Sequence, residues 1–181
     1  MTDRSVYHLA LTASMLDGAT VALLPGDPGR VEGIARTAPF TEARELAHKR
    51  EYRTWIARAA GRPVIVTSTG IGGPSASIAV DELAQLGVRT FLRVGTTGAI
   101  QPHVDIGDVI VTTGAVRLDG ASTHYAPIEY PAVAHHEVVA ALVAAAAEPH
   151  VPARVRIPCT TPTFYPGHER YDPLSGYVPR P

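Results

Sequence analysis

The sequence predicts an α/β fold, because short β-rich runs alternate with glycine loops and helix-like segments. These runs are rich in residue types that favour strands. They cover residues 20–24, 63–68, 90–94, 108–112 and 155–157. Strands that alternate with helices along a chain are typical of α/β proteins.

Segments between these runs have the pattern of helices. The clearest follows Ser75, which we expect to cap it, and ends at Gly87. Its apolar side chains share roughly one face, and they are Ile78, Leu83 and Leu86. A second helix is expected over residues 136–148, and a third should start around Val31, where the first strand has already ended at glycine.

The chain has the length of one ordinary domain, so we expect residues 1–181 to form a single unit. Its 16 Lys and Arg nearly balance its 17 Asp and Glu. The chain as a whole therefore has no positive charge that would attract nucleic acid or an anionic membrane. The start lacks an export signal, and the longest apolar run, residues 138–147, is half of the roughly 20 residues that span a bilayer. A lone cysteine, Cys159, agrees with a reducing compartment, and we expect a cytoplasmic protein.

The first candidate site is the junction at residues 21–30, where a strand breaks at Gly26 and a helix follows. Free backbone N–H groups at such a junction, beside Arg30, suit a phosphate. The alternative is a plain turn, since Pro-Gly and Asp-Pro pairs are common turn chemistry.

The second candidate site is residues 90–98, where Arg93 lies inside an apolar strand that opens into hydroxyls and glycines. A charge in such a strand is costly unless it is paired. Either a structural carboxylate pairs with it, or a ligand binds at the strand's C-terminal end, beside Thr96 and Thr97, where open α/β sheets place ligands.

The third stretch, residues 68–78, is a glycine-dense loop between a strand and a helix. It has neither the dinucleotide-binding fingerprint nor the lysine of a phosphate loop, which argues against a nicotinamide dehydrogenase and a P-loop nucleotidase. Its glycines allow close approach of a ligand to the backbone, or serve only tight packing.

The fourth stretch, residues 163–172, gathers aromatic rings, an imidazole and a guanidinium. This combination suits stacking on, and hydrogen bonding to, a flat heterocycle. The remaining histidines show no metal-ligand spacing with carboxylates.

With these four stretches, the chain resembles the uridine phosphorylases of the nucleoside phosphorylase family over nearly its whole length. Residues 68–83 match the family's signature segment, with Gly70, Gly72, Pro74, Ser75, Ile78, Glu82 and Leu83 in step. Further matches follow in the same order at residues 6–9, 25–30, 91–98, 116–122 and 163–172. The resemblance implies a mixed central sheet, partly barrel-like and flanked by helices, that is incomplete at the C-terminus.

The resemblance also implies a role for each matching residue. Phosphate would be held by Gly26, Arg30, Arg93 and Thr96, with Arg50 joining from a neighbouring subunit. The base would be held by Thr97, Gly98, Phe164, His168 and Arg170, and the neighbour's ribose by His8. A monovalent cation would lie between subunits at Glu51, Ile71 and Ser75. Arg93 and Arg170 would be the catalytic residues.

The activity implied is phosphate-dependent cleavage of uridine to uracil and ribose 1-phosphate, a pentosyl transfer. It needs no cofactor, and inorganic phosphate is the co-substrate that attacks the sugar carbon. Arg170 would stabilise charge on the departing base. The partners would be nucleoside, phosphate and further copies of the chain, in a dimer-based assembly that is a hexamer in the family.

The chain departs from the family pattern in two places. His168 stands where uridine phosphorylases carry a glutamine, and an imidazole offers one donor and one acceptor with a different reach. The family's ribose-binding Met-Glu pair would follow Pro181, so residues 1–181 alone are expected to have little activity. The alternatives are therefore a non-catalytic truncated remnant, or a phosphorylase of another nucleoside.

Overall fold

The computed structural model describes residues 3–147, 152–168 and 176. The chain divides into two compact units, Met1–Thr97 and Gly98–Pro181, and each is described by itself. The single domain expected from the chain length stays a prediction. Across the described residues, no helix combines the length and apolarity needed to cross a membrane.

The first unit, as described over residues 3–97, is built on an open five-stranded sheet of order β2-β3-β4-β1-β5. Its strands are β1 (Val21–Pro25), β2 (Thr41–Lys49), β3 (Tyr52–Ala59), β4 (Arg62–Thr67) and β5 (Thr90–Val94). Strand β1 lies parallel to β4 and β5, whereas β3 is antiparallel to β2 and β4. The sheet is therefore mixed, as expected, and the C-terminal ends of its parallel strands meet at one edge.

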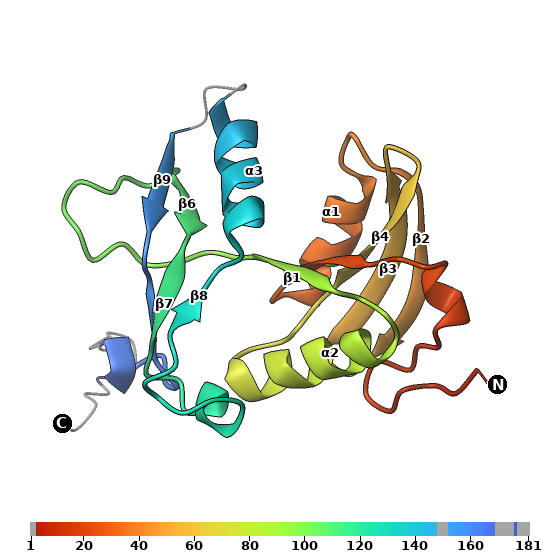
Figure 1. The fold of residues 1–181 in the computed structure, drawn as a ribbon, viewed down its shortest axis with the longest axis horizontal. Helices are drawn as coiled ribbons and strands as arrows, with labels where there is room; N and C mark the ends of the chain where they lie inside the picture. The colour runs from red at the N-terminus through yellow and green to blue at the C-terminus, as the bar shows by residue number, and fades with distance from the viewer. Residues whose placement is uncertain (1–2, 148–151, 169–175, 177–181) are drawn as a thin grey trace. The chain divides into compact units, whose positions relative to one another are not determined.

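Two helices cover opposite faces of this sheet (Figure 1). Helix α1 (Val31–Arg36) packs against side chains that include Leu23 and Val66, and helix α2 (Gly73–Gln85) packs against a cluster that includes Ala22 and Ile65. Successive side chains of a strand point to opposite faces, so neighbouring residues of β1 and β4 enter different clusters. Short 3-10 turns, η1 (Ser14–Leu16) and η2 (Pro28–Arg30), flank β1.

Helix α2 starts earlier than the sequence pattern indicated. Its N-cap is Gly72, which makes no side-chain cap bond, and Pro74 lies in its first turn. Ser75 is consequently inside the helix, and the expectation that it caps α2 is wrong. The expected face is present, because Leu83 is buried and Ile78 and Leu86 pack against the core.

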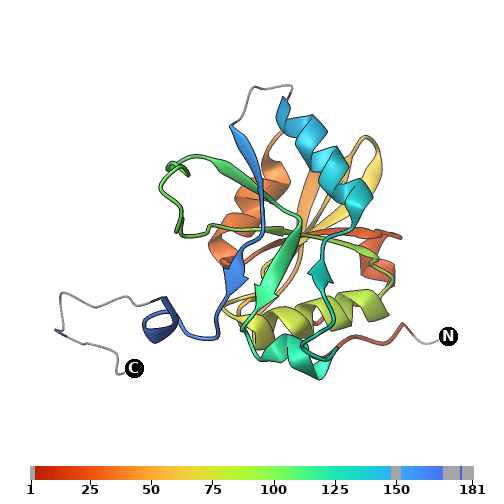
Figure 2. The ribbon, with the colours of Figure 1, turned by 60° about the vertical axis from the view of Figure 1, so that its left-hand side comes forward.

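The second unit, in its described residues, contains a parallel pair of strands and a small three-stranded sheet. The pair is β6 (Val109–Thr112) and β9 (Ala153–Arg156), and helix α3 (His136–Ala147) lies beside both (Figure 2). In the small sheet β7 (Gly114–Arg117) lies between β10 (Cys159–Thr160) and β8 (Ala132–Val133). Turns η3 (Ala121–His124) and η4 (Pro166–His168) complete the unit.

An ion pair between Asp108 and Arg154 links the start of β6 to β9. The Asp108 side chain is only 6% exposed. The hydrogen bond from Arg154, with another from the Asp105 amide, holds the pKa of the Asp108 carboxyl below its usual value. The carboxylate is therefore ionised in the folded state, down to lower pH than in the unfolded chain.

We expect Asp108→Asn to lower the urea midpoint of unfolding near neutral pH. Because the pKa is lowered by folding, this stabilisation is present above the ordinary aspartate pKa of about 3.9 and is lost as the pH falls through the folded value. The difference between variant and wild type should therefore shrink in acid. Asp105→Asn, an exposed change in the same loop, is the matched control and should have little effect. If the difference in urea midpoint between Asp108→Asn and wild type stays unchanged in strong acid, the ionised Asp108 carboxylate is not the source of the stabilisation.

Candidate active site

The loops that follow β1 and β4 are joined at the C-terminal edge of the first unit's sheet. The backbone N–H of Thr69 donates to the carbonyl of Pro25 at 2.9 Å, and that of Gly70 donates to the carbonyl of Gly26 at 3.0 Å. Gly70 has a φ of +68°, a left-handed conformation that glycine adopts without strain. The two loops thus form one continuous backbone surface where the parallel strands end.

The guanidinium of Arg93, near the end of β5, lies between two glycines of this edge. A methyl group on Gly26 would meet Nη2 at 3.0 Å, and one on Gly95 would meet Nη1 at 2.8 Å. Nη1 donates to the carbonyls of Leu24 at 3.0 Å and Val94 at 2.9 Å. Arg93 is exposed as a residue, but these contacts fix its guanidinium in one place.

Two positive charges, those of Arg30 and Arg93, lie close together here. The pKa of Arg93 lies below its usual value, because partial burial penalises the charge and because the guanidinium of Arg30 is nearby. Within the described residues, neither arginine forms an ion pair with a carboxylate. An anion bound between the two guanidinium groups would offset both the cost of burying the charge of Arg93 and the repulsion between the two arginines.

The turn that carries Arg30 is fixed by the residue that precedes it, Asp27. The Asp27 carboxylate accepts a hydrogen bond from the N–H of Gly29 at 2.8 Å, as an N-cap does. A side chain at Gly29 would lie 3.2 Å from this carboxylate, which favours glycine. The sequence around Pro28 therefore folds as a tight turn, and it also borders the site.

These groups line a cavity of about 670 Å³. The lining residues are Gly26, Asp27, Pro28, Arg30, Glu51, Gly70, Ile71, Gly72, Ser75, Arg93, Gly95 and Thr96. The cavity brings together the residues that the sequence suggested for phosphate within one subunit. It also includes all of the residues suggested for a monovalent cation.

Oxygen atoms gather at one side of this cavity. The Ser75 hydroxyl lies 2.9 Å from Glu51 Oε1 and 2.5 Å from the Thr69 carbonyl. The pKa of Glu51 is below its usual value, because its own backbone N–H and the Ser75 hydroxyl donate to the carboxylate. Ile71 is almost fully exposed beside them. Among the described residues, no group of three or more His, Cys, Asp or Glu side chains is placed to hold a metal ion.

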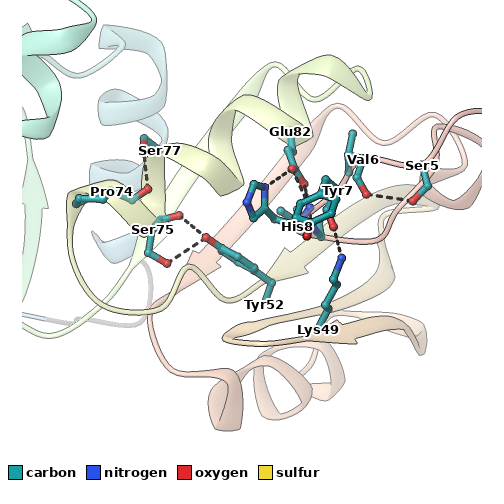
Figure 3. Close-up of polar contacts among 11 residues, drawn as sticks. Ser5, Val6, Tyr7, His8, Lys49, Tyr52, Pro74, Ser75, Ser77 and Glu82 are labelled. Carbon is teal, nitrogen blue, oxygen red and sulfur yellow. Dashed lines mark hydrogen bonds and ion pairs between the residues drawn. The ribbon is translucent and has the colours of Figure 1, made fainter.

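The N-terminal segment presents His8 beside helix α2 (Figure 3). The His8 Nδ1 atom lies 2.7 Å from Oε1 of Glu82, and the His8 side chain is 31% exposed. Arg50 lies in the turn between β2 and β3, where it is exposed and has a φ of +56°. Neither His8 nor Arg50 lines the cavity described above.

The residues suggested for base binding belong to different parts of the chain. Thr97 ends the first unit, whereas Gly98 starts the second. In the second unit Phe164 is exposed and its ring packs edge-on against Tyr165 at 5.3 Å. His168 ends η4, and Arg170 lies outside the described residues.

Sequence reasoning gave no role to two residues, Gly95 and Glu82, that position functional side chains. Gly95 leaves room for the Arg93 guanidinium, and its signal was present in the run of residues that opens after β5. The buried carboxylate of Glu82 had a weaker signal, since an acidic residue in a helix is usually exposed. Its position between the core residues Ala79 and Leu83 of α2 was the available clue.

Known proteins resemble this chain over nearly its whole length. A family model described as the phosphorylase superfamily matches residues 20–173. Uridine phosphorylase of Escherichia coli (strain K12) is 59% identical over 180 residues, which cover 99% of this chain and 70% of that protein. Uridine phosphorylase of Thermococcus kodakarensis is 50% identical over 173 residues, covering 96% of this chain and 61% of that protein.

A relative with a different name matches a shorter part. Guanosine phosphorylase of Halorubrum lacusprofundi is 47% identical over 126 residues, which cover 70% of this chain and 52% of that protein. The matched residues 20–173 contain both Arg30, in the turn η2 after β1, and Arg93, near the end of β5. By the extent and identity of these matches, the chain belongs to the phosphorylase superfamily and, within it, to the uridine phosphorylase family.

Proposed function

We propose that this protein cleaves uridine with inorganic phosphate to give uracil and ribose 1-phosphate. The observation that carries the proposal is the pair of guanidinium groups at the sheet edge, Arg30 and Arg93, which have no carboxylate partner in the described residues. The identity of 59% to a uridine phosphorylase supports the choice of substrate. No cofactor is needed, because phosphate itself is the nucleophile.

Phosphate would bind between Arg30 and Arg93, with the backbone of Gly26 and the hydroxyl of Thr96 completing its contacts. Held in this way, one of its oxygens forms a bond to C1′ of the ribose as the bond from C1′ to the base breaks. The electron pair of the broken bond leaves with the base. Arginine side chains can orient phosphate through paired N–H groups, so the attack starts from a fixed geometry.

The nucleoside would be held from two directions. Thr97, Gly98, Phe164, His168 and Arg170 are proposed to hold the base, as the resemblance implies. Arg170 would stabilise the negative charge on the leaving base. His8 and Arg50, which do not line the cavity of their own unit, would act in the site of a neighbouring subunit. The proposed active assembly is therefore a homo-oligomer built from dimers.

A monovalent cation is a further part of the proposal. The oxygen atoms of Glu51, Ser75 and the Thr69 carbonyl lie close together, and the Glu51 carboxylate supplies a negative charge. Hard cations prefer oxygen ligands of this kind. The carbonyl of Ile71 would contribute from the adjacent loop.

The direct test of the function is an assay of uracil release from uridine in the full-length protein, with and without phosphate. We expect release only when phosphate is present, and saturation with rising phosphate concentration. Release that is independent of phosphate would indicate a hydrolase and overturn the proposal.

A second candidate function is phosphorolysis of another nucleoside. It is favoured by His168, which replaces a glutamine whose amide both donates to and accepts from uracil, and by the match to a guanosine phosphorylase. A panel of uridine, thymidine, guanosine and inosine separates the two functions by their kcat/KM values.

We expect His168→Gln to sharpen the preference for uridine over the other nucleosides by about tenfold, because an amide can donate to and accept from the same base edge. The measurement is the ratio of kcat/KM values across that panel. His103→Gln, a change in the same unit outside the proposed base-binding residues, is the control. Ratios that are the same in wild type and His168→Gln would show that residue 168 does not select the base.

A further inference from the structure

Glu82 is an acidic residue in the core of the first unit. It lies on the inner face of α2 and is only 8% exposed. Its carboxylate accepts hydrogen bonds from the backbone N–H of His8 at 2.9 and 3.0 Å and from that of Leu9 at 2.8 Å. The Nδ1 atom of the His8 ring is a further partner, at 2.7 Å (Figure 3).

The charge of this carboxylate decides the role of the ring. Burial raises the pKa of Glu82, but the backbone N–H groups of Leu9 and His8 and the His8 ring together lower it below its usual value. An ionised carboxylate accepts hydrogen bonds and donates none. The Nδ1 atom must therefore carry the proton that it shares with Glu82, which leaves Nε2 of a neutral ring as an acceptor.

The ring is held on its other sides by aromatic contacts. The ring of Tyr7 meets it edge-on at 4.9 Å between centroids, and that of Tyr52 does so at 6.5 Å. The hydroxyl of Tyr52 is itself fixed by the carbonyl of Ser75, at 3.0 Å. Lys49 donates to the carbonyl of Tyr7, and its ammonium group lies 4.2 Å from the centroid of that ring. Within the described residues, no hydrogen bond occupies Nε2 of His8.

We propose that Glu82 is a positioning residue, which holds His8 with Nδ1 protonated and Nε2 presented as the acceptor for a hydroxyl group of the bound nucleoside's sugar. This inference rests on the proposed function, in which His8 reaches a neighbouring subunit's site. A sugar hydroxyl donates readily to a neutral imidazole nitrogen. Positive charge develops on the sugar ring in the transition state, and hydrogen bonds to a sugar hydroxyl can then strengthen. A correctly oriented acceptor therefore aids the reaction itself.

A merely structural role for Glu82 predicts something different. Three of its four contacts are to the backbone of residues 8 and 9, and they would hold the N-terminal segment even if the ring had no function. In that case replacing Glu82 would act through stability alone. The two roles separate when the effect of Glu82 is measured with and without the His8 ring.

The test is a double-mutant cycle on the full-length protein, using Glu82→Gln, His8→Ala and both together. We expect Glu82→Gln to lower kcat/KM for uridine about tenfold, the size expected for a lost hydrogen bond to a charged group, without changing KM for phosphate. In the His8→Ala background the same change should add almost nothing. Asp81→Asn, on the exposed side of the same helix, is the matched control and should behave as wild type.

Additive effects of the two substitutions on kcat/KM would overturn the positioning role. So would an unchanged kcat/KM in Glu82→Gln together with a reduced one in His8→Ala, since His8 would then work without Glu82. If instead wild type shows no phosphorolysis, or His8→Ala is fully active, the proposed function or the role of His8 has failed.

A second readout does not depend on activity. In protein labelled with ¹⁵N-histidine, we expect the neutral His8 ring to be protonated at Nδ1, and the assignment follows from the signals lost in His8→Ala. Glu82→Gln should move the proton toward Nε2, because the amide N–H₂ can donate to Nδ1. A wild-type ring protonated at Nε2 would overturn the inference, including the case in which Glu82→Gln fails to fold.

Discussion

Replacing Arg93 with alanine is expected to lower kcat/KM for phosphate by about a hundredfold, a typical loss when one donor to a reacting oxyanion is removed. The guanidinium is fixed by the carbonyls of Leu24 and Val94, so it meets an anion without first losing much side-chain freedom. The nearby charge of Arg30 and partial burial both penalise the empty site. A bound phosphate relieves these penalties, and the alanine variant cannot provide that gain.

The matched control for Arg93→Ala is Arg62→Ala. Arg62 is an exposed arginine at the start of β4, and Arg93 lies near the end of β5. Because β4 and β5 both run parallel to β1, the two arginines lie at opposite ends of the strands. Removal of Arg62 changes the net charge equally and should leave phosphate kinetics unchanged. Arg93→Lys should recover only part of the loss, since an ammonium group cannot bind phosphate through two parallel N–H groups. Equal effects of the two alanine substitutions would reduce the role of Arg93 to general charge.

The second large effect is expected for Gly70→Ala, which should lower the free energy of unfolding by about 2–5 kcal/mol. Two penalties add in this estimate. A residue with a φ of +68° is strained when it carries a side chain, and the added methyl group would lie 2.7 Å from Cγ of Glu51 and 2.8 Å from the Ser75 hydroxyl. Relief of these contacts requires movement of the loop that joins β4 to α2, at the wall of the cavity.

Gly61→Ala separates the two penalties. Gly61 has a φ of +76°, and nothing lies within 4 Å of the methyl group that alanine would add. Gly61→Ala should therefore lower the free energy of unfolding only by the conformational penalty, about 1–2 kcal/mol. The free energies are compared by urea denaturation, and phosphate binding by calorimetry should weaken only in Gly70→Ala. The same loss of stability in both variants would mean that the loop yields freely around Gly70.

The phosphate side of the site could be predicted from local sequence. Gly26 directly follows one apolar strand, Arg30 lies in the turn after it, and Arg93 lies near the end of another strand. The C-terminal ends of parallel strands meet on one side of a sheet, which brings these residues together. The turn chemistry around Asp27 is also local. Three of the described strands of the first unit were expected close to their observed positions for the same reason, since their apolar runs are short and bounded by glycine or proline.

The hairpin of β2 and β3 could not be predicted in this way. Strand β2 is rich in Glu, Arg and Ala, residue types that favour helices. It is stabilised mainly by its pairing with β3, in which the register shifts at two places. The contact between Glu82 and His8 was equally hidden. It joins residues 74 positions apart, and only the packing of α2 on the N-terminal segment brings them together.

Phosphorolysis is tested most directly by ³¹P NMR of the full-length protein incubated with uridine and inorganic phosphate. We expect the phosphate signal to be replaced by that of a sugar phosphate ester, in one-to-one proportion with the uracil released, and we expect Arg93→Ala to slow both changes together. Uracil formed while the phosphate signal stays constant, or formation of the ester at the wild-type rate in Arg93→Ala, would contradict this expectation.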